Sequence, residues 1–173
     1  MDVVAQRVAP VLSFTPLADS GTTVQGALDA LGENQWLHLE CHGMPNGTQP
    51  FESSFAMRDG PLTIREIIRS QWQNPEFAFL SACHTTVGHE SSPDEAIHLA
   101  AAMQFAGFRS VIGSMWSVDD KVAGEIVSAF YDNLVDGSGR LDCTRAAVAL
   151  HVTMKALRKV PLEQRIVFIH IGV

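Results

Sequence analysis

Residues 77–85 read Phe77-Ala78-Phe79-Leu80-Ser81-Ala82-Cys83-His84-Thr85. The stretch begins as a short apolar run rich in aromatic residues and ends in a thiol, an imidazole and a hydroxyl. Such a run, bounded by polar residues, predicts a strand that is buried on both faces. Ligands of open parallel sheets bind just beyond the carboxyl ends of such strands. Cys83 therefore lies where a functional residue is expected.

The rest of the chain alternates between strand and helix patterns. Further strands are predicted at 35–41, 110–116 and 166–171, and helices at about 23–31, 63–68, 92–106, 119–135 and 144–159. Gly32 is expected to cap the first helix, and 44–55 is expected to be a surface loop. The stretch 8–15, interrupted by Pro10, is interpreted as an edge strand or part of one. This alternation predicts an α/β fold, with a mostly parallel sheet and helices on both faces.

Side chains of the 35–41 strand divide between two faces of the sheet. Leu37, Leu39 and Cys41 share one face, and Trp36, His38 and Glu40 share the other, because successive side chains alternate along a strand. Cys41 is expected to pack in the core. Glu40 either orients a nearby imidazole or simply pairs with His38, and we favour the second interpretation.

The composition restricts the classes of function. A length of 173 residues suggests one domain, and a net charge of −7 does not indicate nucleic acid or an anionic membrane as a partner. No apolar run approaches the roughly 20 residues of a membrane span, and the first residues do not resemble a signal peptide. Three cysteines without metal-ligand spacing indicate a reduced, cytoplasmic protein.

Cys83 and His42 form the strongest candidate pair for catalysis. A thiol must become a thiolate to attack a carbonyl, and a neighbouring imidazole can make it so and then protonate the leaving group. Both residues follow predicted strands whose ends share one edge of a parallel sheet. The spacing leaves a second interpretation open, in which Cys83 is a buried structural thiol and His42 a satisfied polar residue.

Gly43 directly follows the candidate base. A glycine at this position allows close approach of the backbone to a substrate. The N–H groups of Gly43 and Cys83 are therefore candidate donors to the oxyanion of an acyl-transfer intermediate. No zinc site, dinucleotide fingerprint or serine nucleophile elbow accompanies them, so neither a metal nor a cofactor is expected.

Several segments together resemble the CHAT domain, a branch of the caspase-like cysteine peptidases that is often attached to tetratricopeptide repeats. The resemblance covers roughly residues 22–173 and is carried by 37–43, 80–85, 110–120, Pro61-Leu62-Thr63, Ala129-Phe130-Tyr131 and 168–172. Residues 51–53, 57–60 and 161–164 resemble its fungal members. Caspases similarly carry an alanine–cysteine pair with a histidine about 50 residues upstream.

This resemblance implies a three-layer caspase-like fold and a cysteine endopeptidase. Cys83 would be the nucleophile, His42 the general base and acid, and Gly43 a backbone oxyanion donor. A peptide or protein substrate and an attached sensor or repeat region are implied as partners. It also implies that residues 1–173 form one domain that lacks its first strands, with 1–21 matching poorly.

Asp119 and Asp120 follow the strand that ends near Trp116, where the resemblance places part of the substrate pocket. A carboxylate there would favour a basic residue before the cleaved bond, and His84 is a further candidate substrate contact. The alternative is that at least one of the two aspartates caps the next helix. For the chain as a whole, the alternative function is a catalytically silent interaction or regulatory module, or an inactive fragment of a larger repeat-containing protein.

Overall fold

The computed structural model describes residues 2–9, 13–70, 72, 74–81, 93–116, 118–136 and 138–173. Within these residues the main sheet has four strands in the order β1-β5-β6-β7. Their bounds are β1 Trp36–Leu39, β5 Phe77–Leu80, β6 Ser110–Ser114 and β7 Phe168–Gly172. β1, β5 and β6 run parallel, and β7 is antiparallel to β6. The predicted α/β fold with a mostly parallel sheet is therefore confirmed.

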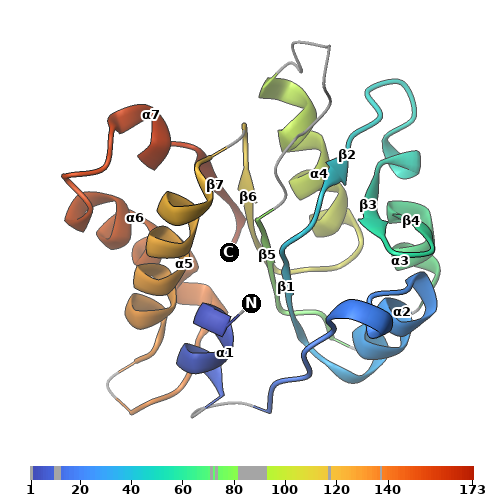
Figure 1. Cartoon of the computed structure of the whole chain (residues 1–173), viewed down its shortest axis with the longest axis horizontal. Coiled ribbons are helices and arrows are strands. Elements are labelled where there is room, and N and C mark those ends of the chain that lie inside the picture. The colour runs from blue at the N-terminus through green and yellow to red at the C-terminus, as the bar shows by residue number, and fades with distance from the viewer. Residues whose placement is uncertain are drawn as a thin grey trace.

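One face of the sheet is covered by helices from the two ends of the chain (Figure 1). They are α1 Asp2–Val8, α5 Asp120–Leu134, the 3-10 turn η3 Cys143–Arg145, α6 Ala146–Ala156 and α7 Leu162–Arg165. Apolar side chains of α1, α5, η3 and α6 form one core with side chains of β5, β6 and β7 on this face of the sheet. Phe79 lies at its centre, fully buried, with its ring centroid 5.2 Å from Phe130 and 5.5 Å from Phe168.

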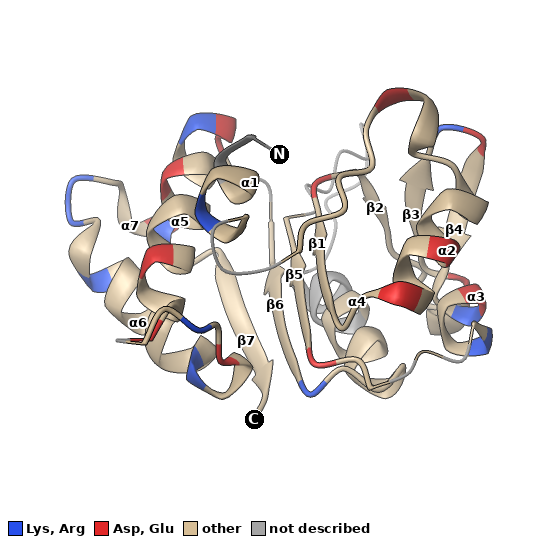
Figure 2. Cartoon of the chain, turned by 90° about the horizontal axis from the view of Figure 1, so that it is seen from below, with Lys and Arg blue, Asp and Glu red and all other residues tan. Residues whose placement is uncertain are grey.

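The opposite face is covered by three helices and a small antiparallel sheet (Figures 1 and 2). The helices are α2 Val24–Glu33, α3 Ile64–Arg69 and α4 Pro93–Phe105, and the strands are β2 Gly43–Met44, β3 Ser54–Met57 and β4 Gly60–Thr63. Two 3-10 turns, η1 Asp19–Gly21 and η2 Pro50–Glu52, join these elements. A second core forms here, and the molecule has three layers.

Local sequence signals set the start of several helices. The Thr63 hydroxyl accepts from the Glu66 N–H while the Glu66 carboxylate accepts from the Thr63 N–H (2.8 Å), as a capping box requires. Thr23 caps α2 and Asp119 caps α5 through their side chains. Figure 2 shows acidic and basic residues spread over many elements. Within the described ranges, every helix is too short or too polar to cross a lipid bilayer.

Alternation along β1 follows the predicted pattern. Leu37, Leu39 and Cys41 pack against the core beneath α2, α3 and α4, whereas Trp36 packs against the core beneath α5. β5 is buried at all four positions, as expected for a strand covered on both faces. The two faces of the sheet are therefore correctly assigned from period-two alternation.

Three local predictions are wrong. The described part of 8–15 contains no strand, because residues 2–8 form α1, whose Val4 and Val8 lie one helical turn apart and are buried against the core. α2 continues through Gly32 to Glu33, and its C-cap is Asn34, whose side-chain amide donates to the Ala30 carbonyl (2.8 Å). The expected surface loop at 44–55 instead contains η2 and the start of β3.

Candidate active site

The candidate residues were expected just beyond the carboxyl ends of the neighbouring parallel strands β1 and β5. Each residue of β1 pairs with the residue 41 positions later, from Trp36 with Phe77 to Leu39 with Leu80. The ladder extends one residue further, because the Ser81 N–H donates to the Leu39 carbonyl (2.9 Å). The carboxyl ends of the two strands therefore lie together, at the edge where β1 continues towards β2 in Figure 1.

The segment after β1 carries His42 and Gly43. His42 is exposed, and Gly43 is buried as the first residue of β2. The Ala56 N–H donates to the His42 carbonyl (2.8 Å), while Gly43 faces Phe55 in the register. This bond joins the residue before Gly43 to the residue after Phe55, so Gly43 and Phe55 themselves are a non-hydrogen-bonded pair of the antiparallel ladder. The backbone N–H and C=O groups of such a pair point away from the partner strand. The Gly43 N–H is therefore not used by the β2–β3 ladder.

Cys83 and His84 lie outside the described residues. On either side of them, β5 ends at Leu80 and α4 begins at Pro93. The pairing of Cys83 with His42 and a substrate contact by His84 therefore stay predictions.

A buried polar group lies beside the end of β1. His38 Nδ1 is 3.0 Å from the Tyr131 hydroxyl of α5, and His38 Nε2 is 3.5 Å from Glu40 Oε1. The imidazole stacks on Phe79, with ring centroids 4.8 Å apart, and its side chain is only 6% exposed. The expected pairing of Glu40 with His38 is confirmed. Together these side chains link the core beneath α5 to the residues just before His42.

Burial lowers the pKa of His38, although the contact with Glu40 opposes this shift. A neutral imidazole has one nitrogen that donates and one that accepts. Since the Glu40 carboxylate only accepts, the proton belongs on Nε2, and the Tyr131 hydroxyl donates to Nδ1. At 3.5 Å this contact is too long for a strong hydrogen bond, so the buried Nε2–H faces the Glu40 carboxylate but is only weakly satisfied by it. His38 is therefore a neutral, polar member of the core.

Replacing Glu40 with glutamine is expected to make the free energy of unfolding fall less steeply as the pH is lowered below about 4. The contact with His38 is the largest of the effects that lower the pKa of Glu40 to about 2, against the opposing effect of burial, whereas an unfolded glutamate has a pKa of about 4.3. The folded state therefore binds fewer protons, and the resulting stabilisation, present above about pH 4.3, is lost as the pH falls towards 2. Urea unfolding across this pH range measures the change in slope.

The matched control for this prediction is Glu33→Gln, at the exposed end of α2. It should leave the acid slope as in the wild type. Equal flattening by both variants would show that loss of a negative charge, and not the contact with His38, causes the effect.

Asp119 and Asp120 have different roles in the fold. The Asp119 carboxylate accepts from the N–H groups of Lys121 (3.0 Å) and Val122 (3.2 Å), so the prediction that at least one of the two caps this helix is confirmed. Asp120 is the first residue of α5 and is exposed. Because the helix already uses the Asp119 carboxylate, Asp120 is the better candidate for contact with a substrate.

The two described cysteines belong to the protein core. Cys41 packs beneath α2, α3 and α4, and burial raises its pKa to about 11. Cys143 is buried at the start of η3, and burial also raises its pKa. The expectation that Cys41 packs in the core is confirmed, and neither thiol is activated for nucleophilic attack.

Sequence reasoning did not identify Tyr131 as the partner of His38. Tyr131 is the chain's single tyrosine and lies 93 residues from His38. It falls on the apolar face of α5, next to the buried residue Phe130. A hydroxyl on a buried helix face requires a hydrogen-bond partner, and this is the signal that could have linked the helix to a polar strand residue.

Comparison with protein-family models gives a match to the CHAT domain over residues 3–166. The matched region spans nearly the whole chain and begins ahead of Thr22, where the resemblance noted above starts. A search of curated proteins gives no match.

Proposed function

Because this chain belongs to the CHAT family, which is related to the caspase-like cysteine peptidases, we propose that it is a cysteine endopeptidase with Cys83 as nucleophile and His42 as general base and acid. The observation that carries the proposal is the register of β1 against β5. Paired residues of these strands are 41 positions apart, and the same 41 positions separate His42 from Cys83. His42 comes three positions after the end of β1, and Cys83 comes three positions after the end of β5. Equal distances from two paired strand ends favour a position of the two residues next to each other.

The proposed reaction proceeds in two stages. His42 takes the proton of the Cys83 thiol, and the thiolate sulfur attacks the scissile carbonyl carbon. The carbon–nitrogen bond then breaks, and the His42 imidazolium gives its proton to the leaving amine. Water next attacks the thioester while His42 accepts its proton, and the acid product leaves as the thiol is restored.

The backbone of Gly43 supports the same proposal. Its N–H is directed away from β3 and is not used by the ladder. Together with the N–H of Cys83, it would donate to the oxyanion of the tetrahedral intermediate. The sequence around His42 thus supplies both a base and an oxyanion donor.

Labelling with a peptide chloromethyl ketone tests the dyad. We expect the wild type to be labelled at Cys83, Cys83→Ala not to be labelled, and His42→Ala to be labelled much more slowly. Equal labelling of all three would reject the dyad. No labelling of the folded wild type would instead favour the alternative of a silent interaction module.

We further propose that Asp120 favours a basic residue before the cleaved bond. A carboxylate in that position would pair with the side chain of arginine or lysine. A peptide-library cleavage profile is expected to show enrichment of these residues, and Asp120→Asn is expected to weaken that enrichment. A profile with no preference for arginine or lysine would exclude the hypothesis. The tetratricopeptide-repeat or sensor region implied by the resemblance also stays a proposal.

A further inference from the structure

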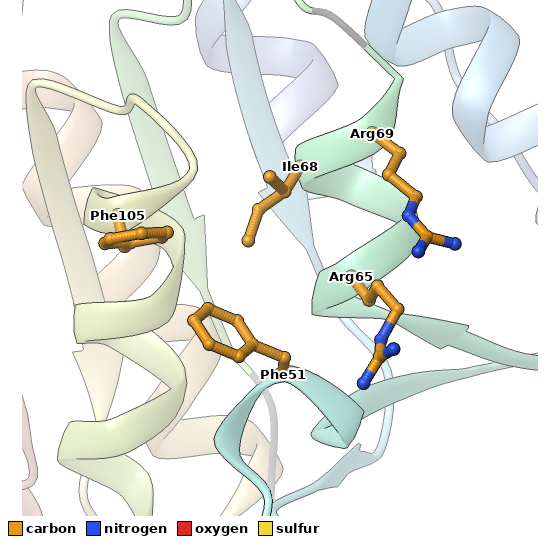
Figure 3. A pocket seen from close by; sticks show the side chains of 5 residues that line it. All are labelled: Phe51, Arg65, Ile68, Arg69 and Phe105. Atoms are coloured by element: carbon orange, nitrogen blue, oxygen red, sulfur yellow. The ribbon is translucent and has the colours of Figure 1, made fainter.

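An open hollow lies between η2, α3 and the end of α4 (Figure 3). It has a volume of about 330 Å³ and is lined by Phe51, Arg65, Ile68, Arg69 and Phe105. This volume is at the lower end of the range for ligand pockets, about 300–1,000 Å³. The hollow therefore suits one or two side chains of a partner better than a large cofactor.

The apolar part of the hollow is formed by two exposed phenylalanines. Phe51 is 44% exposed and Phe105 is 70% exposed, and their ring centroids are 5.5 Å apart. Ile68 projects from α3 towards the two rings in Figure 3. Exposed aromatic residues that gather around a hollow are typical of binding sites, whereas single exposed apolar residues are common on any surface.

The charged part of the hollow comes from α3. Arg65 and Arg69 are four residues apart, so they lie on the same side of the helix. In Figure 3 their guanidinium groups extend from α3 away from the Phe105 ring. Arg65 forms an ion pair with Glu52, which holds η2 beside α3. The Arg69 side chain makes no hydrogen bond or ion pair with any described residue. Within the described residues, the Arg69 guanidinium is thus a cation without an ion-pair partner, on a residue that lines an apolar hollow.

We propose that this hollow is a docking site for a peptide segment of a partner protein, with one bulky apolar side chain flanked by acidic residues. The apolar side chain would pack between Phe51 and Phe105. A neighbouring carboxylate would pair with Arg69, because the planar guanidinium suits carboxylates. The hollow contains neither His42 nor Cys83, so the proposal does not depend on catalysis.

Selection from a displayed library of random 12-residue peptides tests the proposal. The peptides retained by the full chain are expected to share a bulky apolar residue next to aspartate or glutamate. A selected peptide, measured by fluorescence anisotropy, is expected to bind Phe105→Ser at least tenfold more weakly. Arg69→Glu should weaken binding about three- to tenfold, and added salt should reduce that difference.

Matched controls make the outcome specific. Leu162→Ser and Arg158→Glu change an exposed apolar residue and an exposed arginine elsewhere, and both should bind the peptide as the wild type does. Cys83→Ala should also bind normally, which allows binding to be measured without cleavage of the peptide. The proposal is overturned if no peptide is enriched, if the enriched peptides lack acidic residues, or if Phe105→Ser and Arg69→Glu bind them unchanged.

Discussion

Replacing Cys83 with alanine is expected to abolish peptide cleavage, with kcat lowered by at least about 10⁴-fold, as for other essential nucleophiles. The variant loses the only atom that can form the proposed acyl-enzyme. His42→Ala is expected to retain the nucleophile but to lose its activation. A peptide identified in the library profile serves as substrate for both measurements.

The pH dependence of alkylation separates the two roles. A free thiol has a pKa of about 8.5 and is only a few per cent thiolate at pH 7. An imidazole partner increases that fraction, so iodoacetamide should modify Cys83 of His42→Ala about tenfold more slowly at pH 7 than Cys83 of the wild type. Mass spectrometry of the modified peptides follows each cysteine separately.

Cys41 is the internal control in the same sample. Burial raises its pKa to about 11, so it should react slowly in the wild type and in His42→Ala alike. If Cys83 reacts with the same pH profile in both proteins, His42 does not activate it, and the proposed mechanism is wrong.

Replacing Phe79 with alanine is expected to lower the free energy of unfolding by about 3–5 kcal/mol, the usual cost of removing a buried phenylalanine ring. Phe79 is fully buried and joins β1 to α5, since its ring stacks on His38 and lies against Phe130. Domains are stable by only about 5–15 kcal/mol, so this loss is a large part of the total. Chemical denaturation monitored by circular dichroism measures it.

Phe105→Ala is the matched control for this prediction. The same atoms are removed from a side chain that is 70% exposed, and surface substitutions usually change stability by less than about 0.5 kcal/mol. Equal losses in the two variants would contradict the central position of Phe79 in the core.

The main sheet was predictable because its strands carry strong local patterns. Residues 77–80 form a compact apolar run, and 36–41 alternate cleanly between two faces. The small antiparallel sheet lacks such a pattern, since β2 has only two residues and begins shortly after β1 ends. It depends on tertiary packing, chiefly on the buried cross-strand pair Phe55 and Leu62. Turn residues in 44–50 suggested only a loop.

The candidate site was predictable to the extent that it follows strand ends. His42 comes directly after a strand pattern, so its place at the sheet edge could be expected. The contact between His38 and Tyr131 could not be read locally, because it joins residues 93 positions apart in different elements. The hollow beside Phe105 was missed for the same reason, since η2, α3 and α4 meet only in the folded chain.

The constant spacing of 41 between paired residues of β1 and β5 has a consequence for variation of the chain. The hydrogen-bonded pairing of β1 with β5, and not the number of residues that connect the two strands, decides which residues lie side by side just after the strand ends. Residues added between β2 and α3 would therefore change the hollow between η2, α3 and α4, but the carboxyl ends of β1 and β5 would stay aligned. By contrast, a one-residue slip of β1 along β5 would displace His42 by about 3.3 Å and turn every side chain of β1 to the other face.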